Sequence, residues 1–591
     1  MDDHSAWITG AVLVVLLVGL ARELVPPAAG ILAAVLALVL TGVLEVTEAF
    51  AGFANPATLT VAGLFVVARA LREHTDLEGL LTLMLRGARS ERGRLLRLTL
   101  PTAGLSAAMA NTPLVAAAAP IVRTWAERSG RPPSRYLIPL SFAAILGGML
   151  TTIGTSPTLL VSGLVERETG TPFHLFEVTP VSLPVVVVAL TALCVLGPRL
   201  LPDRSSSEQL VIADERAYTL PLQVEPGGAV DGLTVSAAGL RELESAFLAR
   251  IHRGESELAP VRPDEVLRGG DVLVLVGEVA DVTDLAARTG LRLADTTQVH
   301  LLDGGQHDRY EVVLDRASPL AGRTLKEMSF RGRYDAAVLA LHRGGQRVHH
   351  KLGTEVLEPG DSLLVQAASG FDDRWRDRGD FAVVVPLADR TRTPSPRRWF
   401  VLGVVLAMLV IAGSGVLPIL TAVLVACAAL VATRTVSFHA AKASIDLDVV
   451  LIIGAAIGLG AAVTTSGLAT MGAQALVGAV SGQGAVTFAL AVLGLVVTTL
   501  VLTELITNIA AAALMTPIAL DLALQLDADP RRMAIAVAIA ASASFLTPIG
   551  YQTNTIVYGL GGYRFGDYWR VGLPLSVAVT VTTVAVLTFT A

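Results

Sequence analysis

The chain has 591 residues, of which 53% are hydrophobic and 16% are charged, and its mean hydropathy is +0.62. Soluble domains carry about 25% charged residues, so this composition excludes a chain made only of soluble domains. A net charge of -6 and an isoelectric point near 6.0 offer no basic face, which argues against a nucleic-acid partner and leaves the lipid bilayer as the expected environment.

Apolar stretches long enough to cross a bilayer as helices, about 20 residues each, occur on both sides of a long polar segment. Five precede this segment, near 7–25, 28–44, 56–72, 137–165 and 180–200. Five more follow it, near 398–417, 418–433, 447–465, 533–558 and 571–590. We therefore predict a polytopic α-helical protein of the cell membrane, with transmembrane halves at 1–204 and 393–591.

The polar segment, 205–392, has short Val and Leu runs separated by Gly, Asp and Pro, as expected of an α+β insertion. It repeats itself, because His252–Gly254 recurs as His342–Gly344 and Gly270–Asp271 recurs as Gly360–Asp361, each 90 positions later. Two copies of one small domain are therefore predicted, at 205–300 and 301–392.

Each copy resembles the RCK C-terminal domain (regulator of potassium conductance), over about 213–295 and 309–388. The fingerprint G-x-G-x-x-G of the full RCK module does not follow a strand in this sequence, so NAD is not expected as a cofactor. The resemblance makes a cytosolic nucleotide such as cyclic di-AMP a candidate regulatory ligand. The alternative role of the insertion is a passive clamp that stabilises a dimer.

The two membrane halves match each other in sequence. Asn111 corresponds to Asn508 at an offset of 397, and Gly154 corresponds to Gly550 at an offset of 396. A gap of one residue connects the two registers, which indicates an internal repeat.

Charge predicts how the halves are oriented. Arginines crowd both flanks of the segment 98–122, so by the positive-inside rule this segment enters and leaves on the cytoplasmic side. Counting crossings makes the insertion cytoplasmic and brings the equivalent segment, 484–526, in from the opposite face. We predict two inverted repeats of about five transmembrane helices plus one re-entrant hairpin each, the plan of an alternating-access transporter.

Both hairpins carry polar residues where the apolar pattern should continue, namely Asn111, Thr112 and Pro113 in the first, and Thr507 and Asn508 in the second. An amide can offer its carbonyl to a cation and its NH2 group to an anion, and threonine adds a hydroxyl. Hydrogen bonding between helices is the alternative role. Two asparagines at equivalent repeat positions favour a binding site.

A second polar segment follows each hairpin, with the sequences TTIGTSPT (151–158) and LTPIGYQTNT (546–555). Gly and Pro within apolar runs break a helix, which exposes carbonyls to cations and directs helix N-termini towards anions. A simple proline kink is the alternative interpretation. The candidate binding residues in these breaks are Thr152, Gly154, Thr155, Ser156, Thr547, Gly550, Thr553 and Asn554.

Glu504 is a carboxylate within the second apolar hairpin, about one helical turn before Asn508. A charge in such a place is costly unless it is paired, protonated or next to a cation. We interpret Glu504 as a cation ligand or a proton carrier. A structural carboxyl bonded to Thr503 or Thr507 is the alternative.

These motifs, together with TPIGYQTN and the following VYGLGGYRFGDYWRVG, resemble the divalent anion:sodium symporter family (solute carrier 13 type), in the branch with inserted RCK C-terminal domains. The resemblance spans the whole chain. It implies import of sulfate or of di- and tricarboxylates, usually with sodium, by homodimers that move as elevators. The family's Ser-Asn-Thr triplet is replaced by Ala110–Thr112 and by Thr507–Ile509, so each hairpin lacks one hydroxyl.

We therefore predict a homodimeric secondary transporter, not an enzyme, that imports a small divalent anion, sulfate, with sodium as coupling ion and no other cofactor. A di- or tricarboxylate symporter is the alternative. An ion channel gated by RCK-like domains is the alternative of another class, but no filter sequence such as TVGYG is present. The predicted anion ligands are Asn111, Thr112, Pro113, Thr155, Ser156, Thr507, Asn508, Thr553 and Asn554. The predicted cation ligands are Asn111, Thr152, Gly154, Glu504, Asn508, Thr547 and Gly550.

Overall fold

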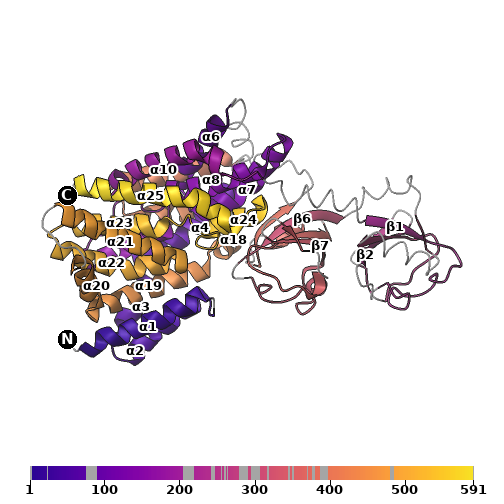
Figure 1. Cartoon of the computed structure of the whole chain (residues 1–591), viewed down its shortest axis with the longest axis horizontal. Coiled ribbons are helices and arrows are strands. Elements are labelled where there is room, and N and C mark those ends of the chain that lie inside the picture. The colour runs from indigo at the N-terminus through magenta and orange to yellow at the C-terminus, as the bar shows by residue number, and fades with distance from the viewer. Residues whose placement is uncertain are drawn as a thin grey trace.

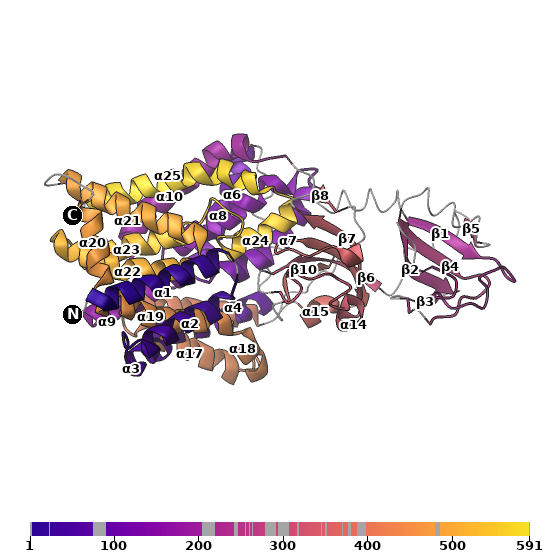
Figure 2. The same ribbon diagram turned by 60° about the horizontal axis from the view of Figure 1, so that its bottom comes forward.

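The structure, a computed structural model, is a body of packed helices with two small β-sheet units in a row beyond one end (Figures 1 and 2). It describes residues 3–22, 24–74, 90–203, 219–240, 246–253, 256–258, 261–262, 264–277, 291–293, 307–315, 318–343, 346–348, 352–368, 370–375, 380–386, 397–478 and 485–589. The helical body comes from the two predicted transmembrane segments, and the sheets come from the segment between them.

The first segment forms helices that begin and end at residues suited to helix termini. Pro27, Pro157 and Pro180 lie in the first turn of their helices, where an N–H group has no helical partner to lose. Gly170 ends its helix with a φ of +78°, a conformation that costs glycine little. The elements are α1 (Asp3–Ala21), α2 (Pro27–Leu40), α3 (Val46–Phe50), η1 (Ala51–Ala54), α4 (Pro56–His74), α6 (Glu91–Ser106), α7 (Asn111–Arg128), η2 (Pro133–Arg135), α8 (Leu137–Gly148), α9 (Ser156–Thr169) and α10 (Thr179–Leu200).

The last segment forms a similar series of helices. Its elements are α16 (Arg398–Gly413), α17 (Ile419–Ala432), α18 (Phe438–Ser444), α19 (Leu447–Thr465), α20 (Leu468–Gly478), α21 (Ala485–Leu505), α22 (Asn508–Gln525), α23 (Pro530–Ser542), α24 (Gln552–Gly561) and α25 (Phe565–Phe589). By length and composition, seven helices of the described chain can cross a membrane. The prediction of a helical, multi-pass membrane protein is therefore confirmed.

The two predicted helix breaks are also confirmed. The first lies between the end of α8 at Gly148 and the start of α9 at Ser156, and the second lies between Ser542 at the end of α23 and Gln552 at the start of α24. The helix pair α6 and α7 packs on α8, and the pair α21 and α22 packs on α23. Beyond each break the chain crosses over, because α9 packs on α22 and α24 packs on α7. Both breaks therefore lie beside the tips of the two helix pairs.

Small residues allow these helices to approach closely. A Cβ atom at Gly147 of α8 would lie 2.2 Å from the backbone oxygen of Ala103 in α6. At Gly572 of α25, a Cβ would lie 2.1 Å from the oxygen of Phe545 in the second break. Close packing of this kind replaces the hydrophobic driving force that helices lack within a bilayer.

The two sheet units share one strand order. The first contains β1 (Thr219–Val224), β2 (Ala246–Arg253), β3 (Ser256–Leu258), β4 (Val272–Gly277) and β5 (Leu291–Leu293), in the order β3-β2-β4-β1-β5. The second contains β6 (His307–Leu314), β7 (Ala336–Arg343), β8 (Gln346–Arg347), β9 (Ser362–Ala368) and β10 (Phe381–Pro386), in the equivalent order β8-β7-β9-β6-β10, with two short helices, α14 (Phe330–Tyr334) and α15 (Phe371–Trp375), and the 3-10 turn η4 (Leu352–Thr354). All strand pairs are antiparallel.

The recurring sequence motifs hold the same contact in each unit. Arg343 donates from Nε and Nη2 to the two carboxylate oxygens of Asp361, at 2.9 Å each, and from Nη2 to the oxygen of Val356 at 2.7 Å. Arg253 repeats this geometry with Asp271 and Val266. The hydrogen bond to Asp361 raises the pKa of Arg343 above its ordinary value. The repeated motif residues therefore fasten a loop to its sheet.

The second sheet unit is fixed to the helical body. Strands β6 and β10 contact α24 and α7, and Val313 and Val383 belong to the same hydrophobic core as the helices. At the centre of the contact, Arg123 of α7 forms an ion pair with Glu311 of β6, and both side chains are at most 5% exposed. The Ser362 hydroxyl donates to the other oxygen of Glu311 at 2.5 Å. The first unit lies farther from the helices (Figure 1).

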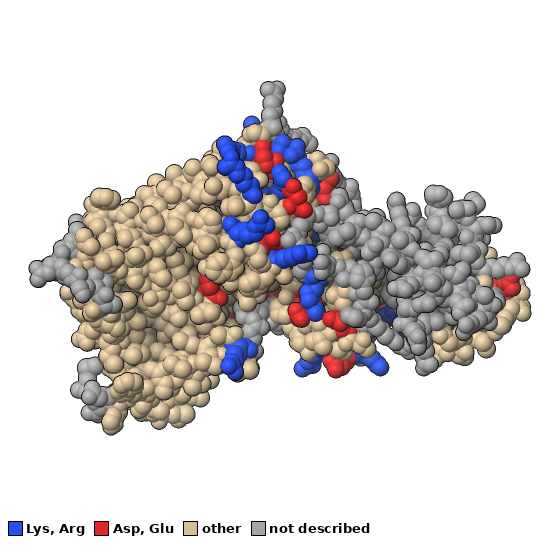
Figure 3. Space-filling view, viewed as in Figure 1, with Lys and Arg blue, Asp and Glu red and all other residues tan. Residues whose placement is uncertain are grey.

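Charged residues are unevenly distributed over the surface. On the face drawn in Figure 3 they form a band where the helical body meets the second sheet unit, while the rest of the helical body is nearly free of them. A nearly uncharged helical surface is what a lipid environment requires.

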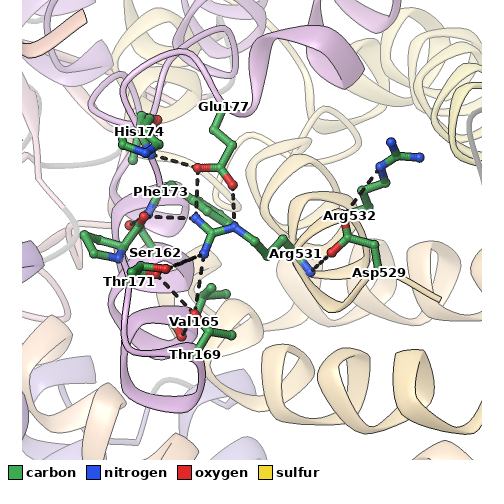
Figure 4. Close-up of polar contacts among 12 residues, drawn as sticks. Ser162, Val165, Thr169, Thr171, Phe173, His174, Glu177, Asp529, Arg531 and Arg532 are labelled. Atoms are coloured by element: carbon green, nitrogen blue, oxygen red, sulfur yellow. Dashed lines mark hydrogen bonds and ion pairs between the residues drawn. The ribbon is translucent and has the colours of Figure 1, made fainter. Parts of the chain in front are cut away.

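One partly buried arginine, Arg531, ties the two helical segments together at the start of α23 (Figure 4). Arg531 donates from Nε and Nη2 to the carboxylate of Glu177, at 2.5 and 2.9 Å, and from Nη2 to the oxygen of Pro172 at 2.9 Å. Its guanidinium also lies 5.2 Å from the ring centre of Phe173. Burial would raise the pKa of Glu177, but the hydrogen bonds from Arg531 dominate and lower it below its ordinary value of 4.5.

We expect Arg531→Ala to lower the free energy of unfolding by about 1–3 kcal/mol, because it removes a charge-assisted bidentate bond. The matched control is Arg532→Ala. The contact of Arg532 with the Asp529 carboxylate is longer, at 3.6 Å, and both side chains are about half exposed. Its expected cost is below about 1 kcal/mol. Thermal unfolding in detergent measures both. The difference between Arg531→Ala and the unmodified protein should shrink as the pH falls below 4.5, because protonation of Glu177 removes the bond.

Candidate functional site

The first hairpin ends at a buried asparagine that contacts both helical halves. Asn111 is the first residue of α7 and is 2% exposed. Its amide nitrogen faces the oxygens of Ala144 and Gly154, at 3.1 and 3.2 Å, and its oxygen accepts from the Tyr551 hydroxyl at 3.0 Å. This orientation is assigned because the reverse places the amide oxygen against acceptors only. The Ser106 hydroxyl oxygen lies 2.5 Å from the same amide nitrogen.

The next two predicted residues lie in the same first turn of α7. The Thr112 hydroxyl donates to the side-chain oxygen of Gln552, at the start of α24, at 3.1 Å in an exposed position. Pro113 follows in the first turn, where its missing N–H costs no hydrogen bond. The N-termini of α7 and α24 therefore face each other at Thr112 and Gln552.

The second hairpin has its own buried asparagine. The Thr507 hydroxyl caps α22 by accepting from the backbone N–H of Ala510 at 3.3 Å. Asn508 is 8% exposed and donates to the oxygen of Ala541, at the end of α23, at 2.9 Å. The Thr503 hydroxyl donates to the same oxygen at 2.6 Å.

Glu504 lies against the second break. Its carboxylate accepts from the backbone N–H of Leu546 and from the Thr547 hydroxyl, at 2.8 Å each. A Cβ atom at Gly550 would lie 2.9 Å from Glu504 Oε2 and 2.2 Å from the Ser544 hydroxyl oxygen, so only glycine fits there. The structure thus brings Glu504, Thr547 and Gly550 together, as predicted for a cation site, and adds Ser544.

Other predicted residues hold the breaks in place. The Thr155 hydroxyl is within hydrogen-bond distance of the hydroxyls of Thr158 (2.7 Å) and Ser542 (3.1 Å), which joins the first break to the end of α23. Ser156 is the first residue of α9. Thr152 is turned away, because its hydroxyl donates to the oxygen of His174 at 2.7 Å.

Thr553 and Asn554 are fully buried in α24. The hydroxyl of Ser141 in α8 donates to the Asn554 side-chain oxygen at 2.7 Å and lies 2.9 Å from the Thr553 hydroxyl oxygen, and Asn554 donates to the backbone oxygen of Ser544 at 3.0 Å. These contacts fix the start of α24 against α8 rather than leaving the two side chains open to a ligand.

Sequence reasoning missed Ser106, Tyr551 and Ser544 as site residues. The repeat offset was a usable signal for Tyr551, because 396 positions separate it from the predicted ligand Thr155. Ser106 has a signal of the same kind, since it corresponds to the hydroxyl residue Thr503 at the offset of 397, whereas Ser544 corresponds to a glycine, Gly148, and has none.

The arrangement suits an anion and cations together. Helices α7, α9 and α24 begin beside Asn111, so N–H groups without helical partners converge there. Helix α22 begins at Asn508, whose partner Ala541 precedes Ser542, a contact of Thr155 in the first break. The oxygens of Ser106, Ala144 and Gly154 surround the Asn111 amide, and the hydroxyls of Ser544 and Thr547 lie beside the Glu504 carboxylate. The hairpin tips and breaks, 106–115, 148–158, 503–512 and 543–556, contain no Lys or Arg.

Paired helical hairpins beside two broken helices define a membrane transporter rather than an enzyme. The chain belongs to the citrate transporter family CitMHS, whose pattern matches residues 12–538 and 489–591. A Chlamydomonas reinhardtii protein named "Putative sulfur deprivation response regulator" is 34% identical over 566 residues, or 93% of this chain and 95% of that protein. An uncharacterized transporter of Synechocystis is 33% identical over 597 residues, covering 99% and 97% of the two chains. "Probable sodium/sulfate cotransporter 3" of Chlamydomonas is 32% identical over 368 residues, or 58% of this chain and 40% of that protein.

Proposed function

We propose that this protein is a symporter that imports a small divalent anion, sulfate, together with sodium. The observation that carries the proposal is the convergence of helix N-termini on two buried asparagines without a cationic side chain. Cotransport of sodium and sulfate by named relatives supports the substrate and the coupling ion. The family's description as citrate transporters keeps a di- or tricarboxylate as the second candidate.

The absence of Lys and Arg from the hairpin tips and breaks gives a physical reason for coupling. An anion in the low dielectric of a membrane protein needs compensating charge. Helix N-termini supply only about half an elementary charge each, shared over the first turn. Since the hairpin tips and breaks lack Lys and Arg, bound cations would supply the remainder, so anion and cation stabilise each other.

The two candidate cation sites are not equal. The first is formed by Asn111, Ser106 and the oxygens of Ala144 and Gly154. The second is formed by Asn508, Glu504, Ser544, Thr547 and the chain near Gly550. Glu504 corresponds to Ala107 at the repeat offset of 397, so only the second site has a carboxylate. Sodium at both sites is our proposal, with proton binding at Glu504 as the alternative.

The reciprocal packing of the halves supports two inverted repeats that work by an elevator-like alternating access. Each hairpin packs on its own broken helix and on the far half of the other one. The sheet units would then be cytoplasmic RCK-like copies within a homodimer of the cell membrane. Because one unit is fixed to α7 and α24, a ligand such as cyclic di-AMP, bound preferentially in one transport state, would shift the balance of states. The passive clamp is the alternative.

Uptake by liposomes containing the purified protein tests the function. Labelled sulfate should enter saturably and only with a sodium gradient, and excess succinate should compete weakly. Strong competition by succinate would identify the dicarboxylate class instead. Unitary conductance without saturable uptake would contradict a carrier and favour a gated channel.

Glu504→Gln should raise the sodium concentration for half-maximal uptake by about tenfold or more. Glutamine keeps the shape, but its NH2 group faces either the Leu546 N–H or the Thr547 hydroxyl, both of which donate to Glu504. Anion selectivity should change less than the cation dependence. The matched control is Glu45→Gln, an exposed carboxylate before α3. Unchanged sodium and pH dependence of Glu504→Gln would make Glu504 structural.

A further inference from the structure

The Asn111 amide connects two environments through its two ends. One end lies among three oxygens, from Ser106 (2.5 Å), Ala144 (3.1 Å) and Gly154 (3.2 Å). The other end lies 3.0 Å from the phenolic oxygen of Tyr551, which immediately precedes α24. A single side chain from the first half thus contacts this group of three oxygens, the cage, and a tyrosine of the second half.

The amide can be satisfied in two orientations. With its nitrogen in the cage, it donates to the two backbone oxygens, and the Tyr551 hydroxyl donates to the amide oxygen. With its oxygen in the cage, four oxygens lie close together, an arrangement that a hard cation stabilises. The amide nitrogen then faces Tyr551, whose hydroxyl must accept. A phenol hydroxyl can serve as donor or as acceptor, so Tyr551 fits both orientations.

Building on the proposed symport, we infer that Tyr551 is an anion ligand whose hydroxyl proton is made available by cation binding at Asn111. When a cation holds the amide oxygen, the amide nitrogen donates to Tyr551, and the hydroxyl proton points towards the anion. When the amide nitrogen occupies the cage, the Tyr551 hydroxyl donates its hydrogen bond to the amide oxygen of Asn111, and the phenolic oxygen presents lone pairs that repel an anion. Cation and anion affinities are therefore linked, and the linkage acts equally in both directions.

Tyr551 lies beside the two helix N-termini that are proposed to hold the anion. The adjacent contact, between Thr112 and Gln552, is exposed, and it joins the N-termini of α7 and α24. The repeat equivalent of Tyr551 is Thr155, whose hydroxyl lies between those of Thr158 and Ser542. The first cation site therefore has a tyrosine that could connect the asparagine amide to the anion, and the second cation site has no equivalent tyrosine.

Tyr551→Phe removes the hydroxyl and keeps the ring. We expect the affinity for sodium alone to change by less than about threefold, because each amide orientation loses one hydrogen bond. The affinity for sulfate at saturating sodium should fall by about ten- to hundredfold, and its increase with sodium should shrink by a similar factor. Titration calorimetry of the purified full chain with sodium, sulfate and succinate measures these quantities. The control is Tyr558→Phe, at a tyrosine within α24, the helix that Tyr551 precedes.

Several outcomes would overturn the inference. Wild-type anion affinity and sodium response in Tyr551→Phe would show that the hydroxyl does not contact the anion. If Tyr551→Phe binds sodium more weakly but its sulfate affinity still rises normally with sodium, Tyr551 only holds Asn111 in place and is not an anion ligand. An unmodified protein that binds neither sulfate nor succinate in a sodium-dependent way would overturn the proposed function itself, and this result is recognisable before any variant is compared.

Asn111→Asp provides a second test that leaves Tyr551 in place. A carboxylate presents an oxygen to the cage without reorientation and always accepts the Tyr551 proton. We expect sodium binding at least as tight as in the unmodified protein and a smaller increase of anion affinity with sodium, because only the charge of the bound cations then links the two. A normal sodium response of sulfate affinity in this variant would contradict the inference that the Asn111 amide sets the direction of the Tyr551 hydroxyl.

Discussion

Alanine at Asn111 or at Asn508 should reduce sodium-driven anion uptake by at least about a hundredfold. Each amide is buried and joins a hairpin tip to a backbone oxygen, of Ala144 and Gly154 in one case and of Ala541 in the other. Its loss removes a ligand and leaves polar groups without a partner, at about 1–3 kcal/mol for each group. The measurement is labelled-anion uptake at equal amounts of inserted protein.

The matched control for both variants is Gln474→Ala, which removes an exposed amide from α20. We expect normal uptake from it. Wild-type uptake by Asn111→Ala or Asn508→Ala at normal expression would contradict the assignment of the site to the hairpin tips. Variants that fail to insert are recognised by size-exclusion chromatography in detergent.

Arg123→Ala should destabilise the contact between the second sheet unit and the helical body by about 3–5 kcal/mol. It removes the charged partner of Glu311, a carboxylate that is 4% exposed. The double variant Arg123→Leu, Glu311→Leu replaces the buried pair by apolar side chains and should recover most of this loss. Thermal unfolding of the full chain and protease sensitivity of the sheet units measure the effect.

The matched control is Arg135→Ala, whose ion-pair partner Asp203 is 60% exposed. An exposed pair contributes at most about 1 kcal/mol. Equal effects of Arg123→Ala and Arg135→Ala would mean that the apolar contacts of Val313 and Val383 hold the unit without the buried pair. If regulation passes through this contact, Arg123→Ala should also abolish any response of uptake to cyclic di-AMP.

Sequence periodicity and repeats were sufficient to predict much of the fold. Apolar runs of spanning length identified the helical segments, because a bilayer requires them. Gly and Pro in the middle of such runs located both helix breaks, since neither residue supports a continuous helix. The offset between Asn111 and Asn508 identified the two hairpin tips. The 90-residue repeat identified two similar sheet units, although it gave no sign that Arg253 and Arg343 fasten loops within them.

Only the tertiary structure decided which polar residues face one another. Thr152, Thr553 and Asn554 were predicted as ligands from their position in the breaks, but their hydrogen bonds go to a neighbouring loop and to α8. The local sequence gives Tyr551 no role beyond that of an aromatic residue in a turn, yet its hydroxyl lies against Asn111, 440 positions away. The docking of Glu311 on Arg123 spans 188 positions. Local pattern determines where a helix stops, whereas the direction of a side chain depends on packing between segments distant in the chain, and no local pattern records that packing.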